Sequence, residues 1–197
     1  MKVVVASRNA HKVREIEALL RECAVTWDLV PIDVVAPTAE LIEDEPTFEA
    51  NALAKARQAV AATGLPALAD DSGIEVDALR GAPGVRSARY AGEPCDDARN
   101  NAKLLEALAD VPPGRRSARY RCAAAFVTAE GGEIVRSGKC EGIVLTEPRG
   151  TGGFGYDPLF FVESLGLTMA ELSAEQKNAI SHRAAAFRAL ASLLRIC

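Results

Sequence analysis

The first residues of the chain combine an apolar, β-branched run at 2–6 with a helical pattern at 11–20. The run is typical of a buried strand, and apolar residues at helical spacing indicate a helix. A strand that passes through a short loop into a helix is the opening unit of an α/β fold. This feature constrains the fold class more than any other part of the chain.

The next segments continue the alternation of strands and helices. Residues 25–35 show a second strand region, which Pro31 and Pro37 break. Thr47 is a good N-cap for an alanine-rich helix at 48–62, which Gly64 ends. A short apolar strand is then predicted at 65–69, and Asp70 and Asp71 lie at its C-terminal end. Loops at strand ends are where α/β proteins place their chemistry.

The second half of the chain predicts a helix at 97–109, strands at 119–128 and 133–145, and helices at 173–180 and 183–196. The turn at 130–132 contains two glycines, so we expect its two strands to be an antiparallel pair. Ser173 and Gln176 have the spacing of a capping box. This order of elements predicts a mixed sheet flanked by helices, with residues 1–197 as one domain.

Composition and charge narrow the class of ligand. Apolar residues make up 49% of the 197 residues, which is enough to build a core. The net charge is −4 and the pI is about 5.3, whereas a nucleic-acid-binding face is normally basic. We therefore expect a small anionic ligand, held by a few local cations and a metal ion, and no nucleic-acid partner.

Targeting signals and cysteines point to the compartment. Neither terminus resembles a targeting sequence, and no stretch approaches the about 20 apolar residues of a spanning helix. The cysteines are scattered and form no CxxC pair, so we expect reduced thiols rather than disulfides or a zinc site. They are Cys23, Cys95, Cys122, Cys140 and Cys197. We expect a cytoplasmic protein without a membrane partner.

The loop between the first strand and the first helix is a candidate phosphate site. Backbone N–H groups at a helix N-terminus attract anions, and Lys12 adds a positive charge. The loop consists of Ser7, Arg8, Asn9, Ala10, His11 and Lys12. It lacks the glycine spacing of a P-loop, so general ATPase or kinase chemistry is not supported. Helix capping by the serine or the asparagine is the alternative interpretation.

Two acidic groups are candidate metal ligands. One is the run Glu43-Asp44-Glu45, and the other is the pair Asp70-Asp71. Mg²⁺ takes carboxylate oxygens together with substrate phosphates, and Asp71 could deprotonate a nearby water for attack on phosphorus. The run could equally be a solvated charged segment.

Lys55 is a further candidate phosphate contact. It lies four residues after Asn51 on the helix at 48–62, so the two side chains share one helix face. The alternative is that Lys55 extends over the alanine-rich surface with its ammonium group in water. The sequence leaves both interpretations open.

A glycine-rich aromatic motif near the C-terminus is a candidate base-recognition site. Aromatic faces hold a base by stacking, while fixed donors and acceptors on the base edge decide which base is held. The candidates are Phe154, Gly155, Tyr156, Asp157, Lys177, His182 and Arg183. Core packing of the aromatic rings and a turn role for the aspartate are the alternatives.

Together these motifs resemble the inosine triphosphate pyrophosphatase family over nearly the whole chain. The matching segments are Ser7-x-Asn9-x-x-Lys12, Thr47-Phe48-Glu49-x-Asn51-Ala52-x-x-Lys55-Ala56, Leu68-Ala69-Asp70-Asp71-Ser72-Gly73, Gly81-Ala82-Pro83-Gly84-Val85-x-Ser87-Ala88-Arg89-Tyr90, Gly152-Gly153-Phe154-Gly155-Tyr156-Asp157-Pro158 and Ser181-His182-Arg183. The resemblance implies a mixed α/β fold with a long curved sheet, two lobes with a central cleft, and a homodimer. It also implies Mg²⁺-dependent hydrolysis of ITP, dITP and XTP to the monophosphate and pyrophosphate.

The resemblance also assigns roles to individual residues. Asp71 corresponds to the general base and metal ligand, and Ser72 to a substrate contact. The second metal-binding glutamate falls on Glu43, with Asp44 and Glu45 left open. His11 departs from the glycine of many relatives, which affects the geometry of the phosphate cradle.

Base selectivity follows from the atoms of the purine edge. Hypoxanthine and xanthine carry an oxygen at C6, so His182 or Arg183 could donate to them, whereas adenine presents an amino group. Leaving polar groups of a site unpaired discriminates by roughly 10⁴–10⁵. Guanine also carries the C6 oxygen, so it has to be rejected at C2.

Two other functions are alternatives to this interpretation of the whole chain. One is a pyrophosphatase for modified pyrimidine triphosphates, and the other is a nucleotide-binding module without catalysis.

Overall fold

A computed structural model describes residues 1–194; the predicted helix end at Ile196, and Cys197, lie outside the described residues. The strands are β1 (Lys2–Val5), β2 (Asp28–Pro31), β3 (Ala67–Val76), β4 (Ser117–Val127), β5 (Glu133–Val144), β6 (Phe160–Val162) and β7 (Leu167–Thr168). The α-helices are α1 (Ala10–Glu22), α2 (Ile32–Val35), α3 (Phe48–Thr63), α4 (Asp97–Ala107), α5 (Ala174–Ile180) and α6 (His182–Leu194). Short 3₁₀ helices span Asp77–Leu79, Gly84–Arg89 and Pro113–Arg115.

The described strands form one mixed sheet in the order β2-β1-β3-β4-β5-β6-β7. β1 pairs in parallel with β2 and β3, whereas β6 pairs antiparallel with β5 and β7. β4 and β5 are joined by a turn closed by the Thr128 N–H, which donates to Gly132 O at 2.8 Å. A connection this short joins antiparallel strands. The predicted mixed sheet flanked by helices is confirmed.

The chain divides into two compact units, and each is considered by itself. The first unit contains residues 1–71, 122–138 and the chain from His182 onward, and the second contains residues 72–121 and 139–181. The sheet strands β3, β4 and β5 each contribute residues to both units. The predicted cleft between two lobes, and the assignment of the chain to one domain, stay predictions.

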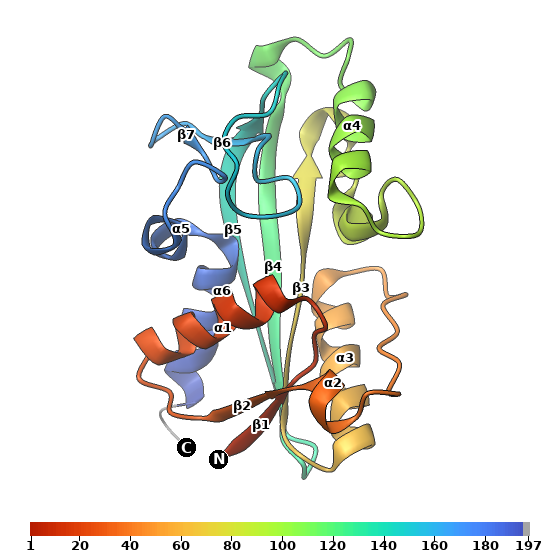
Figure 1. Ribbon diagram of the computed structural model, residues 1–197, viewed down its shortest axis with the longest axis vertical. Coiled ribbons are helices and arrows are strands. Elements are labelled where there is room, and N and C mark those ends of the chain that lie inside the picture. The colour runs from red at the N-terminus through yellow and green to blue at the C-terminus, as the bar shows by residue number, and fades with distance from the viewer. Residues whose placement is uncertain (195–197) are drawn as a thin grey trace. The chain divides into compact units, whose positions relative to one another are not determined.

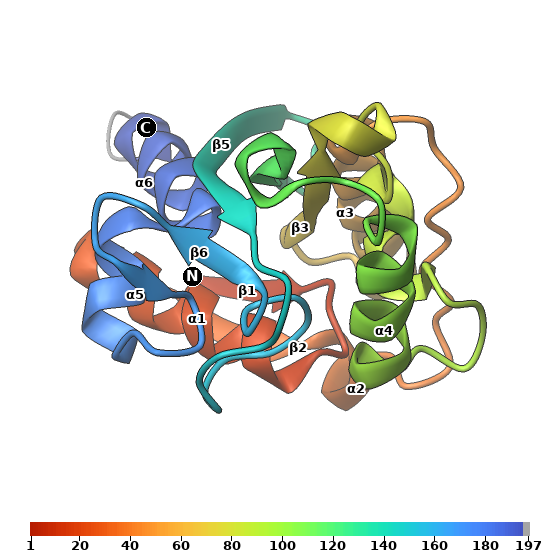
Figure 2. The same cartoon turned by 90° about the horizontal axis from the view of Figure 1, so that it is seen from above.

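In the first unit, helices cover both faces of the strands. α1 packs against α6 on one face, and α3 contacts β1 from the other (Figure 1, Figure 2). Ile16, Leu19, Phe187 and Leu190 are buried in the core beneath α1 and α6. Because β1 is covered on both sides, its residues Val3–Val5 are fully buried, as the β-branched run predicts.

The second unit has its own core between α4 and its strands. Leu104 of α4 is fully buried with Ile74 of β3 and Phe160 of β6. The centres of the Tyr120 and Phe160 rings lie 4.3 Å apart, which adds an aromatic contact to the apolar burial. Tyr156, one of the predicted base-recognition residues, belongs to this core.

Three segments differ from the sequence-based expectations. β2 ends at Pro31, where a break was predicted because proline lacks an N–H, but Ile32–Val35, which was included in the strand region, forms a short helix. β3 continues from Ala67 to Val76 instead of ending before the aspartates. The short strands β6 and β7 were not predicted, because two or three residues carry too little periodicity.

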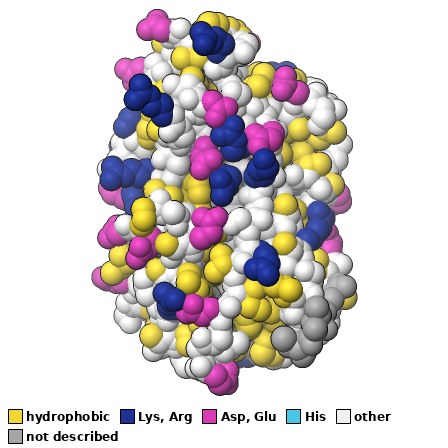
Figure 3. Space-filling view, turned by 180° about the vertical axis from the view of Figure 1, so that it is seen from behind, with side chains coloured by type: hydrophobic (Ala, Val, Ile, Leu, Met, Phe, Trp, Pro, Cys, Tyr) yellow, Lys and Arg dark blue, Asp and Glu magenta, His cyan; other side chains and the backbone are white. Residues whose placement is uncertain are grey.

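The exposed surface mixes charges of both signs. Figure 3 shows Lys and Arg side chains interspersed with Asp and Glu on one face. In the second unit, Arg119 pairs with Asp77 at 2.8 Å and with Glu141 at 3.1 Å. Among the helices of residues 1–194, none is both long and apolar enough to cross a membrane.

Candidate functional site

The loop after β1 is ordered by its own short polar side chains. Asn9 caps α1: its Oδ1 accepts the N–H of His11 at 2.9 Å and of Lys12 at 3.2 Å. The Asn9 N–H in turn donates to Ser7 Oγ at 3.2 Å. Capping, which the sequence left as the alternative, is therefore present. Phosphate binding by Ser7, Arg8, Asn9, Ala10, His11 and Lys12 stays a prediction.

The long side chains of this loop leave in different directions. Arg8 donates to the carbonyls of Pro37 at 3.2 Å and Ala39 at 2.5 Å. The exposed His11 ring lies beside Arg14, with 3.1 Å between Nδ1 and Nη2. Lys12 turns inward, and its Nζ lies 3.3 Å from Asp70 Oδ2. The loop thus places one ammonium group against the β3 acidic pair.

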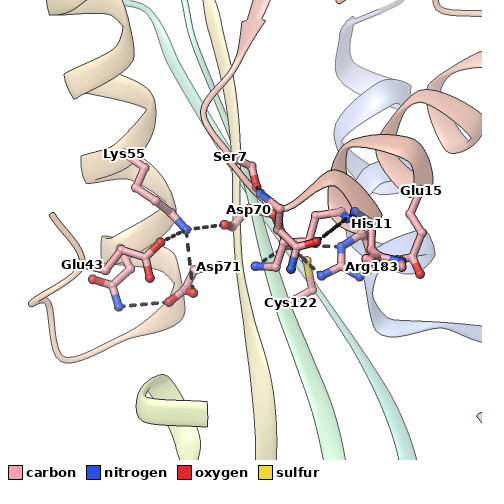
Figure 4. A network of polar contacts seen from close by, with 12 residues as sticks. Ser7, His11, Glu15, Glu43, Lys55, Asp70, Asp71, Cys122 and Arg183 are labelled. Atoms are coloured by element: carbon pink, nitrogen blue, oxygen red, sulfur yellow. Dashed lines mark hydrogen bonds and ion pairs between the residues drawn. The ribbon is translucent and has the colours of Figure 1, made fainter. Parts of the chain in front are cut away.

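The position of that pair within β3 separates its two carboxylates. Successive side chains of a strand point to opposite faces of the sheet. Asp70 points toward the residues of α1 and α6, and Asp71 points toward α3 (Figure 4). Because each face supplies its own cations, two adjacent aspartates can be buried in one strand.

Asp70 is fully buried and lies among three cationic side chains. Its Oδ2 accepts bonds from Arg183 Nε at 3.2 Å and Nη2 at 3.0 Å, in addition to the Lys12 contact. Burial by itself raises the pKa of Asp70, but the charges of Lys12, Arg183 and Lys55 outweigh it and hold the pKa far below its ordinary value. Asp70 is therefore ionised at neutral pH. Burial also raises the pKa of the neighbouring Cys122 thiol, so that thiol stays protonated.

Asp71 is 4% exposed and faces α3. Asn51 Nδ2 donates to its Oδ2 at 3.0 Å, and Lys55 Nζ lies 3.9 Å from its Oδ1. Burial raises the pKa of Asp71, and the charges of Lys55 and Lys12 only partly offset this. A carboxylate with a raised pKa is a better proton acceptor, which is the property a general base needs.

Lys55 joins this carboxylate to the acidic run. It is buried, and its Nζ donates to Glu43 Oε1 at 2.5 Å and to the Asp70 carbonyl at 2.6 Å (Figure 4). Burial lowers the pKa of Lys55, but Glu43, Asp70 and Asp71 outweigh it and raise the pKa. The alternative of an ammonium in water does not hold. Asp44 and Glu45 are exposed, so Glu43 is the member of the run that faces the buried site.

The oxygens around Lys55 fit a hard divalent cation. Glu43 and Asp71 both present carboxylate oxygens to one positive charge. Within residues 1–194, no three His, Cys, Asp or Glu side chains gather into a metal site of their own. Mg²⁺ usually takes one or two carboxylates plus substrate phosphates and waters. The donor set therefore suits Mg²⁺, with Glu43 and Asp71 as the residues that would hold it.

In the second unit, Asp157 organises the aromatic loop. Its Oδ2 accepts Lys177 Nζ at 2.7 Å and the Phe154 N–H at 3.0 Å, and its Oδ1 accepts the Tyr120 hydroxyl at 3.1 Å. Lys177 Nζ also lies 4.8 Å from the centre of the Phe154 ring, which is half-buried. The Tyr156 side chain belongs to the core, where its hydroxyl donates to Ser87 O at 2.8 Å. Phe154 is thus the ring of this motif that lies at the surface.

Helix α4 holds the same loop from another side. Asp97 Oδ2 accepts the Gly155 N–H at 2.6 Å, and Asn101 Nδ2 donates to the Gly155 carbonyl at 2.8 Å. Sequence reasoning missed both residues. Their spacing of four residues shows only that they share a helix face, and nothing local links that face to a loop more than fifty residues away.

The predicted residues divide between the two units. The first unit contains Ser7 to Lys12, Glu43, Lys55, Asp71, His182 and Arg183. The second unit contains Ser72, Phe154, Gly155, Tyr156, Asp157 and Lys177. His182 and Arg183 are both buried, and Arg183 Nη1 also donates to Glu15 Oε2 at 2.5 Å. The Arg183 guanidinium thus binds the carboxylates of Asp70 and Glu15.

A mixed α/β sheet with a buried, cation-supported carboxylate is typical of an α/β enzyme that acts on a small anionic molecule. The chain belongs to the Ham1 family, whose model matches residues 3–193. The sequence motifs that resemble the family, and the charged residues around Asp70 and Asp71, all lie within this matched range.

Curated relatives cover almost the whole chain. It is 54% identical over 192 residues to a dITP/XTP pyrophosphatase of Geobacter sulfurreducens, which covers 98% of this chain and 94% of the relative. It is 48% identical to a dITP/XTP pyrophosphatase of Escherichia coli O157:H7, with 98% of each chain covered.

Solved structures agree with the fold. A HAM1 protein from Coxiella burnetii is similar with a TM-score of 0.89 and 42% identity, and each chain is covered completely, at 100%. A nucleoside-triphosphatase described as a dITP/XTP pyrophosphatase, from Mycobacterium abscessus, gives a TM-score of 0.78 and 46% identity, covering 98% of this chain and 99% of that one.

Proposed function

We propose that the chain is a nucleoside triphosphate pyrophosphatase that hydrolyses dITP, XTP and ITP to the monophosphate and pyrophosphate, with Mg²⁺ as cofactor. The observation that carries the proposal is the buried carboxylate of Asp71, placed with Glu43 around one ammonium group. The names of the curated relatives support the substrate class. Such an enzyme would remove non-standard purines from the nucleotide pool.

The phosphate end of the reaction is assigned to the first unit. Lys12, the N-terminal N–H groups of α1 and Lys55 attract the polyphosphate, because they combine positive charge with hydrogen-bond donors. Asp71 accepts the proton of a water whose oxygen attacks the α-phosphorus. The bond from the α-phosphorus to its bridging oxygen breaks, and pyrophosphate leaves. Bound Mg²⁺ would neutralise charge on the phosphates, with Glu43 and Asp71 as its ligands.

The base end is assigned to the aromatic loop and to the start of α6. Phe154 offers a ring face for stacking, and Lys177 and Asp157 supply a donor and an acceptor whose positions are fixed by their mutual bond. His182 and Arg183 are the proposed donors to the purine C6 oxygen. The carboxylates of Asp70 and Glu15 fix the orientation of the Arg183 guanidinium. Ser72 is proposed to contact the substrate beside Asp71.

The test is a substrate panel with purified protein and Mg²⁺. We expect dITP, XTP and ITP to be turned over at least about a hundredfold faster than ATP and GTP, because the site discriminates at C6 and C2. Phosphorus NMR should show monophosphate and pyrophosphate. Diphosphate plus phosphate as products, or a preference for modified dUTP or dCTP, would refute the proposal.

Two further parts of the proposal concern metal and assembly. Omission of Mg²⁺ should abolish turnover, because the charge of the triphosphate is then not neutralised. We also propose that the protein is a cytoplasmic homodimer. Light scattering on the purified chain measures its molar mass and so tests the dimer. A monomer that is fully active would contradict the dimer without affecting the assigned chemistry.

A further inference from the structure

One face of α3 presents three polar side chains to the segment before the helix. Asn51, Lys55 and Gln58 are spaced four and three residues apart, so they lie along a single face. Lys55 bonds Glu43, as described above. The other two are amides, and each bonds the backbone of one residue in the preceding segment. The acidic run, residues 43–45, is therefore fastened to α3 at several points.

Asn51 makes contacts in two directions. Its Oδ1 accepts the Glu45 N–H at 2.9 Å, and its Nδ2 donates to Asp71 Oδ2 at 3.0 Å. The orientation of the amide is settled by chemistry, because the Glu45 N–H needs an acceptor and therefore requires Oδ1 on its side. Nδ2 then faces Asp71, where a carboxylate oxygen accepts its proton. Asn51 is 1% exposed, so water does not compete for these bonds.

Gln58 is a natural comparison on the same helix face. Its Oε1 accepts the Ile42 N–H at 2.7 Å, and its Nε2 donates to the Ile42 carbonyl at 3.3 Å. It fastens the residue just before the acidic run in the way that Asn51 fastens Glu45. Asn51, but not Gln58, contacts Asp71 among the bonds described. The difference between the two amides isolates the contact to the carboxylate.

We propose that Asn51 is a positioning residue for hydrolysis: it fixes the orientation of the Asp71 carboxylate and its distance from the acidic run. This inference rests on the proposed function, in which Asp71 accepts a proton and shares a cation with Glu43. One oxygen, Oδ2, is held by Asn51, and the other, Oδ1, is then turned toward Lys55. A carboxylate that rotates freely samples the reactive orientation for only part of the time, which lowers the rate.

The central experiment compares Asn51→Ala with Gln58→Ala. We expect Asn51→Ala to lower kcat for dITP by roughly 10- to 100-fold with KM changed less than about threefold, because orientation is lost and binding groups remain. Gln58→Ala should keep kcat within about threefold. Asn51→Asp provides the isosteric test: it still accepts the Glu45 N–H but places a second carboxylate against Asp71, so its kcat should fall as far or further.

A second measurement does not depend on turnover. The affinity of each variant for a dITP analogue with a nitrogen bridge between the α- and β-phosphates is measured by calorimetry. Asn51→Ala should bind it within about threefold of the wild type, as a positioning residue requires. Urea unfolding of each variant shows whether it is folded. If Asn51→Ala does not fold, the kcat of Asn51→Asp tests the positioning role in its place.

The outcomes separate this inference from the proposed function. A wild-type chain that does not hydrolyse dITP refutes the proposed function itself. An active wild type, together with Asn51→Ala and Asn51→Asp variants that keep kcat within about twofold, overturns the role of Asn51. Equal losses in Asn51→Ala and Gln58→Ala also overturn it, because fastening of the segment would then explain the effect without the Asp71 contact.

Discussion

Two nitrogens of Arg183, Nε and Nη2, donate to the same oxygen of Asp70, at 3.2 Å and 3.0 Å. Arg183 is 1% exposed and Asp70 is 0% exposed, so the pair is removed from water. Desolvation and attraction largely cancel in such a pair, but the loss of one partner leaves a buried charge without its compensation. The first prediction follows from this asymmetry.

Arg183→Met should lower the free energy of unfolding by about 3–5 kcal/mol, because Asp70 then remains charged in the core. The double variant Arg183→Met with Asp70→Asn should recover part of this loss. Urea unfolding of both variants measures the difference. A loss below about 1 kcal/mol in the single variant would contradict the assigned energetic role of the pair.

A different variant of the same residue, Arg183→Ala, tests base selectivity. The sequence predicts that Arg183→Ala loses most ITP activity, but a destabilised fold would have the same effect. Kinetics are therefore measured well below the unfolding temperature of the variant. If ITP turnover and rejection of ATP are both unchanged, Arg183 does not read the C6 oxygen.

Asp71→Asn should abolish hydrolysis and stabilise the fold at neutral pH. Removal of a general base typically lowers the rate by roughly 10²–10⁴. Burial raises the folded-state pKa of Asp71, so its contribution to stability is greatest at low pH and is lost as pH rises through that pKa. Ionised Asp71 therefore weakens the fold at neutral pH, and asparagine removes this effect.

Thermal unfolding at two pH values checks that prediction. The midpoint of Asp71→Asn should exceed that of the wild type near pH 7, and the difference should shrink as the pH is lowered toward 4, because the wild-type carboxyl is then increasingly protonated. A variant that is less stable than the wild type near pH 7 would contradict the sign of the shift.

Gly153→Ala should disrupt the aromatic loop. Gly153 has φ of 72°, and a Cβ at this position would collide with the Asp157 carboxylate. That carboxylate bonds Lys177 and the Phe154 N–H, so we expect a rise of roughly tenfold or more in the KM for dITP as these contacts shift. Steady-state kinetics and urea unfolding measure the two effects.

Gly166→Ala is the matched control for that change. Gly166 has a similar φ of 67°, but a Cβ there meets no atom within 4 Å. It should lose only the about 1–2 kcal/mol of left-handed backbone strain, with KM unchanged. Equal KM effects in the two variants would show that strain, and not the collision with Asp157, is responsible.

Asn101→Ala should raise the KM for dITP several-fold with little change in kcat. Its side chain holds the Gly155 carbonyl from α4, so its removal loosens the loop that bears Phe154 but leaves Asp71 untouched. Glu106→Ala, an exposed change on the same helix, serves as the control. A fall in kcat at constant KM would argue against a role in holding the base loop.

Much of the fold was predictable because its signals are local. Thr47 caps α3 and Gly64 ends it in the left-handed conformation, as their residue types predict. The capping box of Ser173 and Gln176 is also present at the start of α5. Each of these signals acts over three or four residues, so neighbouring sequence is sufficient to read it.

The end of β3 was not predictable in this way. An aspartate pair normally marks the end of an apolar strand, because adjacent buried like charges are unfavourable. Here the strand continues through Asp70 and Asp71, because Arg183 compensates one and Lys55 lies beside the other. Arg183 is 113 residues from Asp70 in the chain, so no local sequence pattern could predict that the two side chains pair.

The amino-acid sequence therefore predicted the candidate site residues, which stay a prediction, and most of the helices and strands that bear them. Tertiary structure alone decided how the acidic pair is shared: the pleat of β3 turns Asp70 toward α1 and α6 and Asp71 toward α3. The physical reason is that propensities and caps depend on neighbours in the chain. The charge and proton affinity of a buried carboxylate depend instead on which helices cover each face of its strand.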